Sequence, residues 1–140
     1  MSDCYLIDTD IIIYWLKDTY PEIKKKIEKI EDGCIFISSI TVAELYFGAY
    51  NSSKLDDNLK LISELISEIN ILNFDPKSGE KFGKIKADIK KKGKILNDSD
   101  IFIAATAISN DLILVTNNEK HFQRIENLSI QNWTKQTKIL

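Results

Sequence analysis

Three acidic residues lie where hydrophobic patterning predicts burial. Asp8 follows an apolar run near the N-terminus, Glu44 lies within the apolar segment 40–47, and Asp100 immediately precedes the apolar segment 101–108. An ionised carboxylate in such surroundings is costly unless another group compensates its charge. Taken singly, Asp8 or Asp100 could cap a helix, and Glu44 could pair with a lysine. Three comparable acids instead favour one shared site.

The chemistry open to such a site follows from its donor atoms. Carboxylate oxygens are ligands that suit Mg²⁺ and Mn²⁺. A bound ion can activate water and stabilise the attacking and leaving oxygens of a phosphodiester, without a histidine or cysteine nucleophile. Helix capping explains one acid near residue 100 but not both Asp98 and Asp100, so Asp98 is a further candidate catalytic residue. His121, the only histidine, falls in a predicted surface turn, and we expect it to be solvated.

Short apolar strands alternate with amphipathic helices, and this alternation must position the acids. Strands are predicted over residues 4–7, 34–37, 71–74, 112–115 and 128–130, and helices over 10–17, from Pro21 to near Gly33, over 41–50, over 55–69, from Pro76 to Gly93, over 98–110 and around Phe122. The pattern predicts an α/β protein, a three-layer α/β/α sandwich with a mostly parallel central sheet. Residues 1–140 fit one domain.

Ligands of parallel sheets bind beyond the carboxyl ends of the strands. Asp8 directly follows the first predicted strand, at such an end. On a helix, Glu44 shares an apolar stripe with Ile40, Ala43 and Phe47, which places it toward the core. Residues from different elements are therefore expected to meet at one edge of the sheet.

Composition excludes several other classes of protein. The hydrophobic fraction of 44% and the charged fraction of 29% are ordinary for a globular domain. The N-terminus lacks the basic region of a secretory signal, and no apolar run is long enough to span a bilayer, so we expect a cytoplasmic protein. Cys4 and Cys34 are therefore expected to be buried free thiols rather than a disulfide.

Basic residues are concentrated in one segment, although the net charge of the chain is −2. Seven lysines and a single acid, Asp88, lie between Lys81 and Lys94. A basic surface beside an acidic pocket suits a polyanion held over metal ions, and we name Lys90, Lys91 and Lys92 as candidate RNA contacts. A solvated helix face is the simpler alternative for this segment.

Four segments resemble a known family in their order and spacing. They are Leu6-Ile7-Asp8-Thr9-Asp10, Ile37-Ser38-Ser39-Ile40-Thr41-Val42-Ala43-Glu44-Leu45, Asp100-Ile101-Phe102-Ile103-Ala104-Ala105 and Leu114-Val115-Thr116-Asn117-Asn118. The ordered set resembles the PIN-domain nucleases, and most closely the VapC-type toxins of prokaryotic toxin–antitoxin pairs. The resemblance covers nearly the whole chain.

The resemblance implies specific roles within a Mg²⁺- or Mn²⁺-dependent endoribonuclease. Asp8 and Asp100 would be the principal metal ligands, and Glu44 would complete the acidic centre directly or through water. Thr9 and Thr116 would orient the carboxylates or the attacking water. Family members frequently carry a fourth acid where this chain has Asn118, an amide without charge. Asp98 would partly substitute for that acid, with Asp10 as a weaker candidate.

The same resemblance implies partners. It predicts an RNA substrate, such as a tRNA or rRNA, a homodimer, and a cognate VapB-type antitoxin that blocks the site. Sequence alone identifies neither the RNA nor the antitoxin.

Three alternatives use the same residues differently. Asp8-x-Asp10 after a strand is found in haloacid-dehalogenase-type phosphoryl transferases, with Asp8 as nucleophile, but Ile12 stands where a small or hydroxyl-bearing residue is expected. Asp75 could be the phospho-acceptor of a receiver domain, but the segment 116–118 lacks the required lysine. A catalytically weak or inactive PIN-type RNA-binding domain is the third alternative, because Asn118 replaces an acid.

Overall fold

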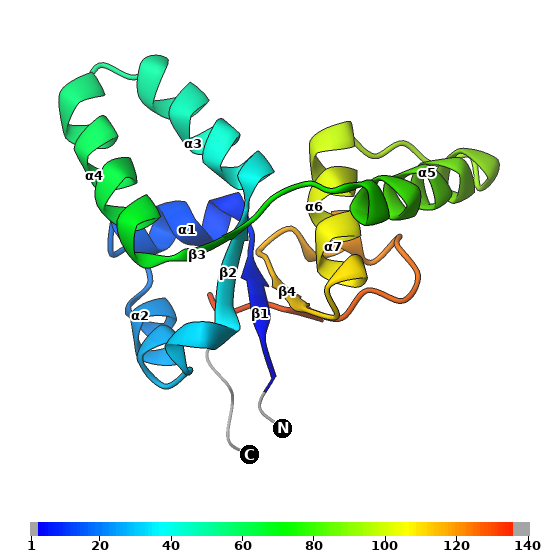
Figure 1. The fold of residues 1–140 in the computed structure, drawn as a ribbon, viewed down its shortest axis with the longest axis horizontal. Coiled ribbons are helices and arrows are strands. Elements are labelled where there is room, and N and C mark those ends of the chain that lie inside the picture. The colour runs from blue at the N-terminus through cyan, green and yellow to red at the C-terminus, as the bar shows by residue number, and fades with distance from the viewer. Residues whose placement is uncertain (1–2, 136–140) are drawn as a thin grey trace.

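A five-stranded parallel sheet forms the centre of the computed structural model, which describes residues 3–135 (Figure 1). The strands are β1 (Tyr5–Ile7), β2 (Ile35–Ser38), β3 (Asn70–Leu72), β4 (Ile113–Val115) and β5 (Ile130–Gln131). They lie in the order β3-β2-β1-β4-β5, and every pair is parallel. The predicted parallel sheet is confirmed.

Helices cover both faces of this sheet. They are α1 (Thr9–Leu16), α2 (Pro21–Glu28), α3 (Ser39–Tyr50), α4 (Leu55–Glu68), α5 (Pro76–Lys91), α6 (Asp98–Ser109) and α7 (Glu119–Phe122), with a short 3-10 turn at Asp32–Cys34. In Figure 1, α1 to α4 lie to the left of the sheet and α5 to α7 to the right. The predicted three-layer α/β/α sandwich is therefore confirmed.

Alternating side chains of the strands build two hydrophobic cores. Ile7 and Val115 point into one core, together with residues of α1 to α4 and Trp133. Leu6 and Leu114 point into the other core, together with residues of α5 to α7. Because both faces are covered, the central strands β1 and β4 are apolar throughout, as expected of a parallel sheet.

Side-chain caps fix where three helices begin at the carboxyl edge of the sheet. The carboxylate of Asp8 accepts from the backbone N–H of Thr9 at the start of α1, and the Ser38 hydroxyl accepts from Ile40 at the start of α3. Asn97 caps α6 by accepting from the N–H of Asp100. These caps satisfy backbone donors that a helix leaves unpaired.

The strand order changes direction at β1. From β1 the chain continues to β2 and β3 on one side, and then crosses to the other side of β1 to form β4 and β5. The carboxyl ends of β1 and β4 therefore flank a topological switch point, where parallel α/β proteins place their ligands. Asp8 follows β1 and Thr116 follows β4 at this point.

The third and fifth strands differ from their predicted bounds. β3 ends at Leu72, whereas we predicted it to reach Phe74. The reason is tertiary packing, since the Phe74 ring joins those of Phe82 and Phe102, with 4.9 Å between the centroids of Phe74 and Phe102. β5 lies at Ile130–Gln131, beyond most of the predicted segment 128–130.

The prediction that Cys4 and Cys34 are free thiols is wrong, because the structure joins them in a disulfide. Tyr5 pairs with Ile35 across β1 and β2, so the preceding cysteines face each other with their Cα atoms 4.3 Å apart. The expectation of free thiols rested on the compartment, whereas strand register brings the two residues together.

No helix within residues 3–135 is long and apolar enough to cross a membrane.

Candidate functional site

Asp8 is the most buried acid of the site, with 4% of the residue exposed. Its Oδ1 accepts from the N–H of Thr9 at 2.8 Å, and its Oδ2 accepts from the Thr116 hydroxyl at 2.7 Å. The Thr116 hydroxyl in turn accepts from the N–H of Asn118 at 3.0 Å, which leaves its proton for Asp8. Both oxygens of the carboxylate are therefore held in fixed directions.

Glu44 reaches the same edge of the sheet from α3. Its Oε1 accepts from the Thr9 hydroxyl at 2.7 Å, and the Thr41 hydroxyl lies 3.1 Å from that of Thr9. Because a carboxylate only accepts, Thr9 donates to Glu44 and accepts from Thr41. Thr9 thus contacts Asp8 through its backbone and Glu44 through its side chain.

The apolar stripe predicted around Glu44 does not face the core. The buried residues of α3 are Thr41, Leu45 and Ala49, whereas Ala43 is exposed and Phe47 is 71% exposed. Because α3 is apolar on nearly all sides, its sequence does not specify which face is buried. Glu44 consequently lies at the boundary between the core and an exposed apolar surface.

Asp10 and Asp100 complete the cluster of acids. Asp10 accepts from the N–H of Ile11 at 2.7 Å and from the N–H of Asn117, beyond β4, at 3.1 Å. The side chain of Asp100, in the first turn of α6, is 14% exposed. The acids come from three helices that all begin at the carboxyl edge of the sheet, where helix N-termini stabilise negative charge.

The proximity of the acids changes their proton affinity. Burial, then the charge of Asp10, raises the pKa of Asp8 to about 7, against hydrogen bonds from Thr116 and Thr9 that lower it. Burial also raises the pKa of Asp10 and of Asp100, and the nearby Glu44 contributes to the increase at Asp100. Asp100 in turn contributes to the increases at Asp8 and Asp10. Asp8, Asp10 and Asp100 therefore lie within electrostatic range of one another, and Glu44 lies within range of Asp100.

This donor set suits a divalent cation. Within residues 3–135, the one basic side chain beside these carboxylates is that of His121, which lies 3.5 Å from Asp100 and is charged only when protonated. No three acidic, histidine or cysteine side chains of the described residues converge on a point as metal ligands. Buried oxygen ligands that repel one another nevertheless fit Mg²⁺ or Mn²⁺, which would supply the missing positive charge.

Two predicted site residues lie apart from this cluster. The carboxylate of Asp98 is 2.9 Å from Lys86 Nζ on α5, and its side chain is 54% exposed. Asn118 is exposed, and its backbone N–H, rather than its amide group, is what contacts Thr116. The structure thus brings together Asp8, Glu44 and Asp100 but turns Asp98 toward α5.

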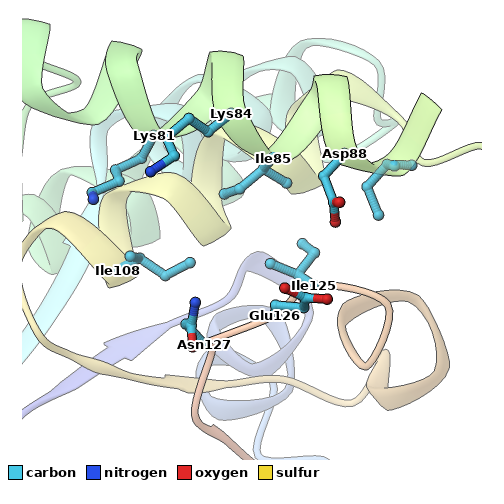
Figure 2. Close-up of a pocket in the computed structure, with 9 residues that line it drawn as sticks. Lys81, Lys84, Ile85, Asp88, Ile108, Ile125, Glu126 and Asn127 are labelled. Carbon is cyan, nitrogen blue, oxygen red and sulfur yellow. The ribbon is translucent and has the colours of Figure 1, made fainter. Parts of the chain in front are cut away.

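The predicted lysine surface is divided. Lys92 Nζ pairs with Asp88 at 2.9 Å and with Glu126 at 2.8 Å, whereas Lys90 and Lys91 are exposed. A hollow of about 320 Å³ lies beside this ion pair, between α5, α6 and the segment after α7. Figure 2 shows its two lysines, Lys81 and Lys84, at the opposite end from the carboxylates of Asp88 and Glu126.

Two residues lie closer to the acids than the sequence indicates. Asp10 is only a weaker candidate from the sequence, and the expectation that His121 is solvated is confirmed by its exposure. The side chain of His121 is 50% exposed, but its Nδ1 lies 3.5 Å from Asp100 Oδ2. The spacing after β4 could have indicated that His121 lies at the site. A short helix places residue 121 one turn beyond Asn118, beside the switch point.

Comparison with known proteins identifies the family of this chain. The PIN domain family matches residues 5–128. The chain therefore belongs to the PIN domain family.

Its relatives within that family are VapC ribonucleases. The chain is 43% identical over 129 residues to ribonuclease VapC2 of Haemophilus influenzae, covering 92% of this chain and 97% of that protein. It is 32% identical over 130 residues to the tRNA(fMet)-specific endonuclease VapC of Shigella flexneri, covering 93% and 98%. The DNA-bound VapBC structure from Salmonella typhimurium matches with a TM-score of 0.88 and 31% identity, covering 94% of this chain and 99% of that one.

Proposed function

We propose that this chain is a Mg²⁺- or Mn²⁺-dependent endoribonuclease, the toxin of a toxin–antitoxin pair. The observation that carries the proposal is the buried Asp8 at the switch point, whose raised pKa reflects burial and neighbouring acids. When bound, the ion would activate a water molecule and stabilise charge on the phosphodiester oxygens.

The side chains would act mainly by position. Asp8 and Asp100 would hold the ion, and Glu44 would bind it directly or through water. Thr116 would keep one oxygen of Asp8 fixed, and Thr9 would orient Glu44 through the bond at 2.7 Å. Such preorientation is what a catalytic metal site requires of the groups around it.

A tRNA is the substrate that we propose, because a relative at 32% identity is a tRNA(fMet)-specific endonuclease. Lys90 and Lys91 are candidates for phosphate contacts, since both are exposed in the last turn of α5. With an RNA substrate, the protein would act in the cytoplasm. Lys92 would contribute less, because two acids already pair with it.

A VapB-type antitoxin is the protein partner that we propose, since VapBC complexes of relatives have been solved. A groove of about 170 Å³ between α1, α3 and α4 would receive an apolar segment of it. Ile13, Leu16 and Leu61 line this groove, and Glu44 stands at its end. A segment bound there would also obstruct the acids.

Self-association would use a different surface. The apolar patch of Ile40, Ala43, Phe47 and Phe102 lies between α3 and α6 and is open to solvent. Large exposed apolar patches mark association sites. We propose that a second copy of the chain covers this patch in a homodimer.

RNA cleavage by purified protein tests the proposed activity. We expect cleavage of a tRNA pool with Mn²⁺ or Mg²⁺, its loss with a chelator, and a decrease of at least about 100-fold in Asp8→Asn. The control Asp57→Asn changes an exposed acid on α4 and should leave cleavage unchanged. Equal cleavage by the wild type and Asp8→Asn would indicate a contaminating nuclease. RNA binding without cleavage by the wild type would favour the inactive RNA-binding alternative.

A further inference from the structure

His121 is held beside the acids by the packing of α7. The helix follows β4, and its Phe122 is fully buried in the core below α6. This anchor sets the neighbouring His121 at the edge of the site, where its Nδ1 faces the carboxylate of Asp100. The imidazole is therefore the one nitrogen donor that β4 and α7 bring to a cluster otherwise made of carboxylates.

The two groups lie close enough to share an ion. The Nδ1 of His121 and the Oδ2 of Asp100 are 3.5 Å apart. An ion bound at about 2.1 Å by each atom, at the right angle of octahedral coordination, would separate them by about 3.0 Å. A small movement of the exposed ring suffices to reach this arrangement.

We propose that His121 is a ligand of the ion held by Asp8 and Asp100, and that it makes the site prefer Mn²⁺ to Mg²⁺. This inference rests on the proposed function, because it needs an ion at the acids. Mg²⁺ takes oxygen ligands, whereas imidazole suits first-row transition metals. Mn²⁺ accepts both kinds of donor, so a site of carboxylates with one imidazole discriminates in its favour.

The sequence makes the spectroscopic test unambiguous. The chain has a single histidine, so an imidazole nitrogen bound to Mn²⁺ in untagged protein can only come from His121. Pulsed EPR of the Mn²⁺-loaded protein should detect coupling to this nitrogen in the wild type. The coupling should be absent in His121→Gln and His121→Glu, which change an exposed side chain and should keep the fold.

Calorimetric titration of Mn²⁺ and of Mg²⁺ measures the preference. We expect His121→Gln to lower Mn²⁺ affinity by about 10-fold or more and Mg²⁺ affinity by less than about threefold. His121→Glu should raise Mg²⁺ affinity above that of the wild type, because it places an oxygen donor at the position of the imidazole. Lys120→Gln is the matched control on the same helix and should change neither affinity.

Two results would overturn the inference in different ways. If Mn²⁺ binds the wild type without imidazole coupling, and Asp8→Asn abolishes that binding, His121 is not a ligand and the proposed metal site stands. If neither ion binds the wild type, the proposed metal-dependent function fails together with the inference. Equal losses of both affinities in His121→Gln would refute the preference for Mn²⁺.

Discussion

The carboxylate of Asp8 is arranged for function at a cost to stability. Its pKa is raised from 3.8 to about 7, so the folded state binds a proton that the unfolded state releases between these pH values. The free energy of unfolding therefore falls as pH rises through this window, on the order of 4 kcal/mol for a shift of this size. At neutral pH and without metal, the charged site opposes folding.

This linkage predicts the behaviour of Asp8→Asn. In chelator, the wild type should lose stability between pH 5 and pH 8, and the variant should lose much less because its amide does not titrate. Urea unfolding at both pH values measures the difference. Adding Mn²⁺ at pH 8 should stabilise the wild type and not the variant. Parallel pH profiles of the two proteins would contradict the raised pKa.

Asp98 and Asp100 provide a matched pair within one helical turn. Asp98 pairs with Lys86, whereas the side chain of Asp100 is mostly buried among the other acids. We expect Asp100→Asn to reduce RNA cleavage by at least about 100-fold and Asp98→Asn by less than about threefold. Single-turnover cleavage rates under saturating Mn²⁺ distinguish them. A large loss of RNA cleavage in Asp98→Asn would indicate that Asp98 is a further acid of the site.

Sequence reasoning found the acids but not every neighbour. Asp8, Glu44 and Asp100 could be selected because each charge stands in an apolar segment. His121 could not, since it lies in a polar segment, and Asp10, which precedes the apolar residues 11–16, was named only as a weaker candidate. Their proximity to the other acids depends on where β4 ends and how α7 packs, which only the spacing after β4 indicates.

At the scale of elements, the exposed end of α5 is the surface that we propose for RNA. Replacing both Lys90 and Lys91 with glutamate should weaken RNA binding and make it less dependent on salt. The slope of log affinity against log salt concentration should become shallower by about 0.7 for each phosphate group that the protein no longer neutralises. Fluorescence anisotropy over a salt series measures both quantities. Reversal of Lys24 and Lys25 on α2 is the control for net charge. Identical salt slopes for the two double variants would indicate that the exposed end of α5 is a solvated helix surface that does not contact RNA.

Periodicity predicted the elements well where they alternate strongly between apolar and polar residues. The sheet, the long helix α4 and the lysine-rich α5 lie close to their expected ranges. The predicted buried face of α3 was wrong because that helix is apolar on nearly all sides. The strand β3 ends earlier than predicted because Phe74 packs on α6. The pairing of Cys4 with Cys34 follows from strand register, which sequence does not display.

The whole molecule presents an apolar patch beside its acids, which predicts its state of assembly. Phe47→Lys should convert the proposed dimer to a monomer, because it places a charge in the centre of the patch. Light scattering after size-exclusion chromatography should show half the mass of the wild type. Ile95→Lys, which changes an exposed residue of the α5–α6 connection, is the control. A wild-type monomer, or a dimer that survives Phe47→Lys, would contradict this interface.

Every acid of the cluster occupies the first two turns of a helix or its cap, so the remote ends of those helices take no part in holding it. The far half of α3, together with α4, can change its surface while the acids stay in place. A different antitoxin of the proposed kind could then be accommodated without disturbing the acids. Exchanging residues 52–69 between relatives should transfer partner choice and leave the hydrolytic machinery intact.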